Sequence, residues 1–197
     1  MKSVLISIQP KWCELIANGK KTIEVRKTRP KIDVPFKCYI YCTEGDALAT
    51  PCLNIPKYTI HRMNNGTVEG RKMTQQERKQ SDHTYANGKV IGEFVCDKII
   101  QYECSSDGFG ELATTCGTCL TYDEIINYCN GYDLFGWKIT DLVIYDKPKE
   151  LFEFANYNKY QVCKEKGCFS DNCWICPNNA ILTRPPQSWC YVEELGA

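Results

Sequence analysis

The order of the apolar segments constrains the fold most. One helical segment lies between the first two expected strands, and several further strands follow with few helices between them. Residues 3–8, "SVLISI", form a β-branched run typical of a strand. Residues 10–21, "PKWCELIANGKK", predict a helix that begins at Pro10 and ends at Gly19. Residues 22–26, "TIEVR", alternate as a strand does. A doubly wound fold needs regular strand and helix alternation, so we instead expect an α+β fold, a small mixed, mainly antiparallel β-barrel with flanking helices.

The later segments continue this pattern. Further strands are expected over residues 36–43, 88–103, 136–146 and 188–195, and further helices over residues 121–131 and 147–155. Thr121 and Glu124 fit a capping box at the start of one such helix. Gly92 interrupts an expected strand, which indicates a bulge or a close approach of another backbone. Residues from about 53 to 88 are polar, so we expect an insertion there, formed as a hairpin or a flap.

Length and composition predict a single domain over residues 1–197, with 43% hydrophobic residues to build its core. The formal net charge is zero, so bulk charge alone predicts no polyanionic partner. Lys and Arg nevertheless dominate the N-terminal part, which is compatible with a local anion-binding surface. The first apolar run is too short for a signal peptide, and no run is long enough to span a membrane. With fourteen cysteines, these observations predict a cytoplasmic protein with reduced thiols.

Four cysteines near the C-terminus form a candidate metal site. Cys163, Cys168, Cys173 and Cys176 are spaced C-x4-C-x4-C-x2-C among polar residues. Four thiolates can surround one tetrahedral zinc ion, and the metal would supply folding energy that so polar a segment lacks. We therefore expect structural zinc in a cysteine-rich insert at about residues 157–183. Free thiols, or disulfides formed after purification, are the alternatives.

Cys116 and Cys119 form a second C-x2-C pair in "TTCGTC". Cys104 and Cys129 are their nearest cysteine neighbours in the sequence but are imperfectly spaced for a shared metal ion. We interpret these residues as ordinary thiols, with a second metal site as the alternative.

Residues 19–30, "GKKTIEVRKTRP", contain the main candidate ligand site. Alternation places Glu24 and Arg26 on one face of the strand, and Lys21 lies in the turn before it. An exposed ion pair with little effect on stability is the simpler interpretation. A cleft that opens onto this strand would change it, because burial and neighbouring charges alter the protonation of such groups.

The segment "SIQPKWCELIANGKKTIEVRKTRP" resembles the ASCH domain, the activating-signal-cointegrator homology family, whose signature is G-x-K-x-x-E-x-R after an N-terminal helix. Gly19, Lys21, Glu24 and Arg26 match all four positions. The resemblance extends to "KVIGEFVCDKI" and to "RPPQSWCYVEEL", which looks like the closing strand of prophage-encoded and clostridial-type members. It implies a β-barrel related to the PUA RNA-binding domain, with the motif residues in a cleft beside the barrel.

The resemblance also implies that the chain binds RNA or a nucleotide. We expect the ligand to contact Lys21, Glu24, Arg26 and Arg29. A glutamate can accept a hydrogen bond from the exocyclic amine of a base, while lysine and arginine hold a phosphate or a carbonyl oxygen. A zinc-stabilised interaction protein of prophage origin is one alternative.

A hydrolase is the other alternative, because the family includes amidohydrolases that deacetylate N-acetylcytidine. In these, a lysine at the position of Lys21 is catalytic and is helped by a threonine and a distant glutamate. Glu24 occupies the threonine position here, and a carboxylate opposes the negative charge that develops during amide hydrolysis. Glu124 or Asp123 could serve as the distant acid of such an amidohydrolase. Lys21 and Glu24 could instead cleave RNA by general acid and base catalysis.

Overall fold

A computed structural model describes residues 1–44, 59–62, 68–71, 87–167 and 179–195 of the chain. Its elements are β1 (Ser3–Ile8), α1 (Pro10–Ala17), β2 (Ile23–Arg26), β3 (Phe36–Cys42), β4 (Thr59–Arg62), β5 (Val68–Arg71), β6 (Lys89–Tyr102), α3 (Ser106–Thr114), α4 (Tyr122–Cys129), β7 (Leu134–Lys149), the 3-10 turn η1 (Leu151–Glu153), β8 (Phe154–Asn156), α5 (Tyr157–Glu165) and β9 (Trp189–Glu194). Across these described ranges, no helix has both the length and the apolar character that crossing a membrane requires.

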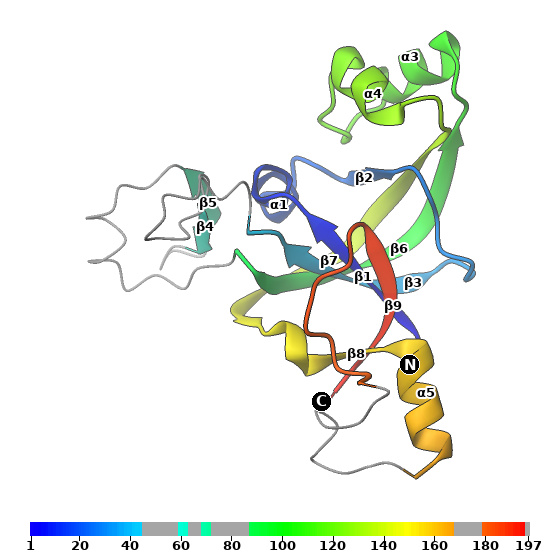
Figure 1. The fold of residues 1–197 in the computed structure, drawn as a ribbon. Helices are drawn as coiled ribbons and strands as arrows, with labels where there is room; N and C mark the ends of the chain where they lie inside the picture. Colours follow the sequence, from blue (N-terminus) through cyan, green and yellow to red (C-terminus); the bar gives the residue numbers. More distant parts are fainter. Residues whose placement is uncertain (45–58, 63–67, 72–86, 168–178, 196–197) are drawn as a thin grey trace, which may run out of the picture.

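Seven strands form one sheet in the order β2-β7-β6-β3-β1-β9-β8 (Figure 1). Strands β1 and β3 pair in parallel, and the other neighbours in this sheet pair antiparallel. The expected α+β class and the mixed, mainly antiparallel sheet are therefore confirmed. Strands β4 and β5 form a separate antiparallel pair within the polar insertion, as a hairpin would.

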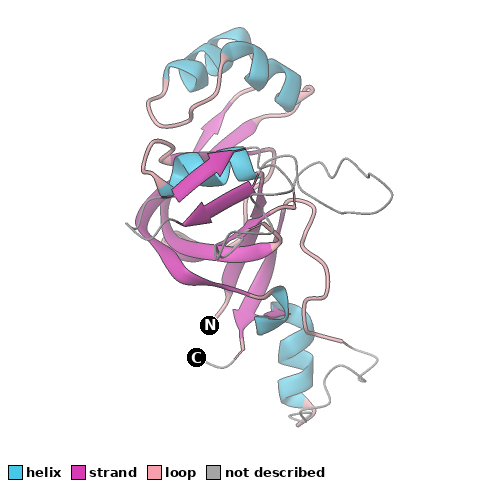
Figure 2. Cartoon of the chain, turned by 90° about the vertical axis from the view of Figure 1, so that its left-hand side faces the viewer, coloured by secondary structure: helices cyan, strands magenta, loops and turns pink. Residues whose placement is uncertain are grey.

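The expected closed barrel is wrong for the described strands. Strands β2 and β8 form the two edges of the sheet, and no ladder joins them in this part of the chain. The sheet is instead strongly curled (Figure 2), and long strands β6 and β7 follow the curl through several register shifts. One shift lies at Gly92, where a Cβ atom would lie 2.3 Å from the carbonyl oxygen of Val143. The prediction of a bulge and a close backbone approach at this glycine is confirmed.

Strand β2 separates two hydrophobic clusters. On one of its faces Ile23 and Val25 pack with buried residues of α3 and α4, including Leu112 and Ile125. The main core lies within the curl of the sheet and is built by alternate residues of β1, β3, β6 and β7, with α1 packed against it. Because side chains alternate along a strand, Glu24 and Arg26 lie on the face of β2 opposite Ile23 and Val25, toward β1 and α1.

Two expectations about helices differ from the structure. The helix expected over residues 147–155 is wrong, because β7 continues through Lys149 and is followed by η1 and β8. Helices α3 and α5 were not expected from the sequence. Both carry an N-cap side chain, since Ser105 accepts from the Gly108 amide and Asn156 from the Lys159 amide. The capping box predicted for Thr121 and Glu124 is present at α4.

Candidate functional site

The end of α1 sets the position of Lys21. The Gly19 amide donates to the Ile16 carbonyl at 2.9 Å, and the Lys20 amide donates to the Leu15 carbonyl at 2.9 Å. This pair of bonds is a Schellman motif, and Gly19 adopts the left-handed φ of 70° that the motif requires. The tight reversal brings Lys21 to the start of β2, so the predicted glycine turn is confirmed.

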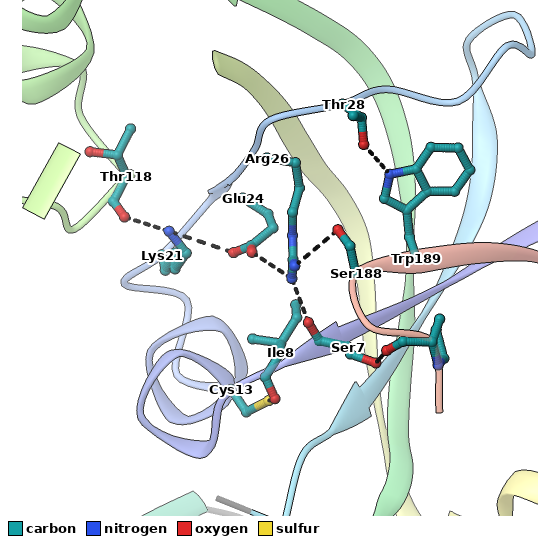
Figure 3. A network of polar contacts seen from close by, with 11 residues as sticks. Ser7, Ile8, Cys13, Lys21, Glu24, Arg26, Thr28, Thr118, Ser188 and Trp189 are labelled. Carbon is teal, nitrogen blue, oxygen red and sulfur yellow. Dashed lines mark hydrogen bonds and ion pairs between the residues drawn. The ribbon is translucent and has the colours of Figure 1, made fainter. Parts of the chain in front are cut away.

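The Lys21 side chain is buried, with 2% of its surface exposed. Its amine donates to the Thr118 carbonyl at 2.5 Å and lies 3.6 Å from Glu24 Oε2 (Figure 3). The amine also lies 5.1 Å from the centre of the Trp12 ring. Burial lowers the pKa of Lys21, while the Glu24 carboxylate opposes this shift.

Glu24 and Arg26 form a buried ion pair at the curl of the sheet. Arg26 Nη2 lies 3.0 Å from Glu24 Oε1 and donates to the Ser7 carbonyl of β1 at 2.6 Å. Arg26 Nη1 lies 3.5 Å from Ser188 Oγ, just before β9. The two side chains are 7% and 11% exposed, so the interpretation as a solvated pair is wrong. Arg26 joins β2 to β1 through its side chain, where a closed barrel would use strand pairing.

Two polar atoms of this group lack a hydrogen bond. Glu24 Oε2 and Arg26 Nε are buried without such a partner among the described residues. Glu24 Oε2 has only the more distant charge of Lys21 beside it. An unpaired buried polar atom costs roughly 1–3 kcal/mol, which is typical of sites that hold a ligand or store strain.

A turn before α4 closes over Lys21. The Gly117 carbonyl accepts from the Thr22 amide at 2.9 Å, and a Cβ atom at Gly117 would lie 2.0 Å from Thr22 Oγ1. The turn includes Cys116 and Cys119, which are exposed free thiols. In the described part of the chain, no three or more His, Cys, Asp or Glu side chains are arranged to hold a metal ion.

A cavity of about 210 Å³ opens above the buried charges. Its lining consists of Ser7, Ile8, Gln9, Trp12, Lys21, Glu24, Val25, Arg26, Leu120, Glu124 and Tyr128. Trp12 comes from α1 and Tyr128 from α4, so aromatic side chains contribute to the cavity from two elements. The site thus combines a charged floor with aromatic walls.

The structure separates the predicted site residues. Lys21, Glu24 and Arg26 line the cavity together, whereas Arg29 is exposed and does not. Glu124 also lines the cavity and pairs with Lys11 at 3.2 Å, while Asp123 is exposed outside it. The Thr121 amide lowers the pKa of Glu124 by donating to its carboxylate. This carboxylate is therefore ionised at neutral pH.

The sequence analysis missed the aromatic residues of the cavity. Trp12 lies in the helix before the family motif, and the sequence does not distinguish it from the other apolar residues of that helix. Tyr128 was not singled out, and its position four residues after Glu124 is the signal that places both near one helix face. Trp189 lies elsewhere: its ring packs edge-on against Trp137, and its nitrogen donates to Thr28 Oγ1 at 2.9 Å.

The predicted zinc ligands are only partly described. Cys163 is buried on α5, with 3% of its surface exposed. Cys168, Cys173 and Cys176 lie outside the described residues. The zinc site remains a prediction.

Comparisons with known proteins agree with this fold. A model of the ASCH domain family matches residues 6–164. The crystal structure of ASCH from Zymomonas mobilis has a TM-score of 0.51 and 18% identity, covering 97% of this chain and 87% of that chain. Two mutant proteins from the same organism give TM-scores of 0.50 and 0.51, with 17% and 16% identity. They cover 98% and 97% of this chain, and 91% and 88% of their own. No curated protein sequence matches the chain.

Proposed function

Since the chain belongs to the ASCH domain family, we propose that it binds RNA or a nucleotide in the cavity above Lys21, Glu24 and Arg26. The observation that carries the proposal is the buried group of two cations and one carboxylate at the floor of an open cavity. Such a group is costly to bury, and a ligand with matching donors and acceptors would offset that cost.

The chemistry of the cavity favours a nucleobase as the bound group. Glu24 Oε2 is an unpaired acceptor suited to an exocyclic amine, and the adjacent Lys21 amine can donate to a ring or carbonyl acceptor. Trp12 and Tyr128 offer aromatic surface on which a base can stack. A volume of about 210 Å³ is below the roughly 300–1,000 Å³ of drug-sized pockets, which favours a single base over a duplex.

Calorimetric titration with nucleoside monophosphates tests the proposal. Cytidine and adenosine monophosphates carry an exocyclic amine that uridine monophosphate lacks, so we expect wild type to bind them at least about tenfold more tightly. Glu24→Gln should reduce this preference, because an amide donates as well as accepts. Glu111→Gln, at an exposed glutamate of α3, is the control and should retain it. Equal affinity for all three nucleotides, or no binding, would reject the proposal.

A hydrolase is the second candidate, favoured by the lowered pKa of Lys21 and its 3.6 Å separation from Glu24 Oε2. A buried lysine that loses its proton more readily can act as a general base. The same protein samples, incubated with short single-stranded RNA and with acylated cytidines, separate the candidates by mass spectrometry. Turnover that Lys21→Ala abolishes would establish an enzyme, whereas binding without turnover would support the binding module.

For the cysteine-rich segment we propose structural zinc held by Cys163, Cys168, Cys173 and Cys176. The support is the number and spacing of these cysteines among polar residues. Thiolate ligands fit a cytoplasmic location. A protein that contains zinc but does not bind nucleotides would instead fit the alternative of a zinc-stabilised interaction protein.

Elemental analysis of protein purified under reducing conditions should find about one zinc per chain if four thiolates form one site. Cys173→Ser should lose most of the metal, because a closed thiolate site needs all its ligands. Cys104→Ser, at an exposed cysteine after β6, should keep it. Less than about half an equivalent of zinc in wild type would contradict this prediction.

A further inference from the structure

Two exposed tyrosines and one lysine adjoin the cavity. The Lys27 amine lies 5.2 Å from the centre of the Tyr128 ring and 5.7 Å from that of Tyr132. Tyr128 is 38% exposed and Tyr132 is 61% exposed, whereas tyrosine side chains are on average partly buried. Tyr128 also lines the cavity, so this group, which we call the outer platform, begins where the cavity ends.

The strand that supplies the cavity floor also supplies the cation of the outer platform. Arg26 is the last residue of β2 and turns inward, whereas Lys27 follows it directly and reaches the two tyrosines. No carboxylate of the described residues forms an ion pair with Lys27. Its charge is therefore free to meet an anion.

Two carboxylates close in sequence to the tyrosines of the outer platform, Glu124 and Asp133, already have partners. Glu124 accepts from the Thr121 amide at 2.9 Å and pairs with Lys11. Asp133, next to Tyr132, accepts from the Cys104 amide and from Gln101 Nε2, each at 2.8 Å. These bonds reduce the repulsion that a phosphate would otherwise meet beside α4.

We propose that the outer platform binds the nucleotide adjacent to the one in the cavity, with Lys27 at the bridging phosphate and Tyr132 stacked on the second base. The inference rests on the proposed function and specifies its ligand class as a single-stranded oligonucleotide. The main support for this inference is that Tyr128 belongs both to the cavity and to the outer platform, so a chain of nucleotides can pass from one to the other. Aromatic residues joined to a cation are the usual means of binding single strands.

The test compares cytidine monophosphate and adenosine monophosphate with single-stranded RNA trinucleotides containing cytidine and adenosine. Wild type should bind the best trinucleotide at least about tenfold more tightly than the best mononucleotide, since one stacked base changes affinity by roughly 5- to 150-fold. Tyr132→Ala should remove most of this difference and leave mononucleotide affinity unchanged, whereas Tyr132→Phe should keep it. Lys27→Ala should reduce the salt dependence of trinucleotide binding by about one phosphate contact.

Tyr122→Ala is the matched control. Tyr122 lies on α4 and is 40% exposed, but no lysine or arginine of the described residues lies over its ring. Its replacement should change neither affinity. Trinucleotide affinity that equals mononucleotide affinity, or that survives Tyr132→Ala, would overturn the outer platform while leaving the proposed function intact. No binding of any probe would overturn both. A dimer that Tyr132→Ala converts to a monomer would identify the surface as a contact between copies and would also overturn the inference.

Discussion

Replacing Arg26 by methionine is expected to lower the free energy of unfolding by about 3–5 kcal/mol. The side chain is buried, and its loss leaves the Glu24 carboxylate with only the more distant Lys21 amine. The substitution also removes the donor of the Ser7 carbonyl, which lies 2.6 Å from Arg26 Nη2. Because this bond links β2 to β1 across the open side of the sheet, the loss should affect the whole fold. Urea unfolding followed by circular dichroism measures the change.

Two further variants distinguish the effect of losing the buried Arg26–Glu24 pair from the effect of losing any charged side chain. Lys138→Met removes one partner of the Lys138–Asp97 pair, which is 48% and 39% exposed, and should cost less than about 1 kcal/mol. Adding Glu24→Gln to Arg26→Met should recover part of the loss, because no unpaired carboxylate then remains buried. An Arg26→Met protein as stable as Lys138→Met would show that the buried contact contributes little.

Local patterns predicted the parts of the site that depend on neighbouring residues. The apolar alternation in β2 separated Ile23 and Val25 from Glu24, and the glycine turn after α1 was placed correctly. Both features depend only on residues close together in the sequence, so local sequence patterns are enough to predict them. The family signature then linked Lys21, Glu24 and Arg26 before their common cavity was visible.

Burial of these charges could not be predicted in the same way. Arg26 meets Ser7 and Ser188, which lie 19 and 162 residues away, so its environment depends on how the whole sheet curls. Strand pairing gives the same alternation whether a face points to solvent or to another strand. Tyr128 entered the cavity because α4 packs on β2 through Ile125, a contact between segments far apart in the sequence.

Pro148 shows how a local rule can mislead. Proline suits the first turn of a helix, which favoured a helix over residues 147–155. The structure places it near the end of the long strand β7 instead, where the antiparallel pairing with β6 extends to Lys149. Pro148 lies in the register shift between the Gly92–Ile144 and Val90–Lys149 pairs, and such an irregular stretch tolerates a residue without an amide donor. Helix α5 could not be predicted from periodicity, because its residues are mostly polar and show no regular apolar spacing.

Replacing Lys21 by methionine is expected to reduce nucleotide affinity at least about tenfold and to lower the free energy of unfolding by about 1–3 kcal/mol. The amine would supply a charge-assisted hydrogen bond to the ligand, and such bonds contribute about 1.5–3 kcal/mol. The free protein loses the hydrogen bond from the amine to the Thr118 carbonyl. The cost stays below that of Arg26→Met, because burial already disfavours the charged amine and Glu24 keeps its closer contact with Arg26. Calorimetric titration and urea unfolding of the same samples give the two quantities.

Lys20→Met is the matched control, because Lys20 is exposed in the same turn. It should alter neither nucleotide affinity nor stability by a measurable amount, apart from a small change in salt dependence. Equal loss of affinity in both variants would show that the turn attracts anions only by its general charge. Unfolding of Lys21→Met, with Lys20→Met intact, would assign Lys21 a structural role instead.

The pH dependence of stability gives an independent test of the state of Lys21. Burial lowers its pKa in the folded protein, whereas the unfolded chain has the ordinary value of about 10.4. Below the lowered pKa both states hold the proton, so this group adds no pH dependence. Between the two values the unfolded state binds more protons, and wild-type stability relative to Lys21→Met should therefore rise from pH 7 toward pH 10. A difference that stays flat over this range would mean that Lys21 keeps an ordinary pKa, and the general-base role would lose its support.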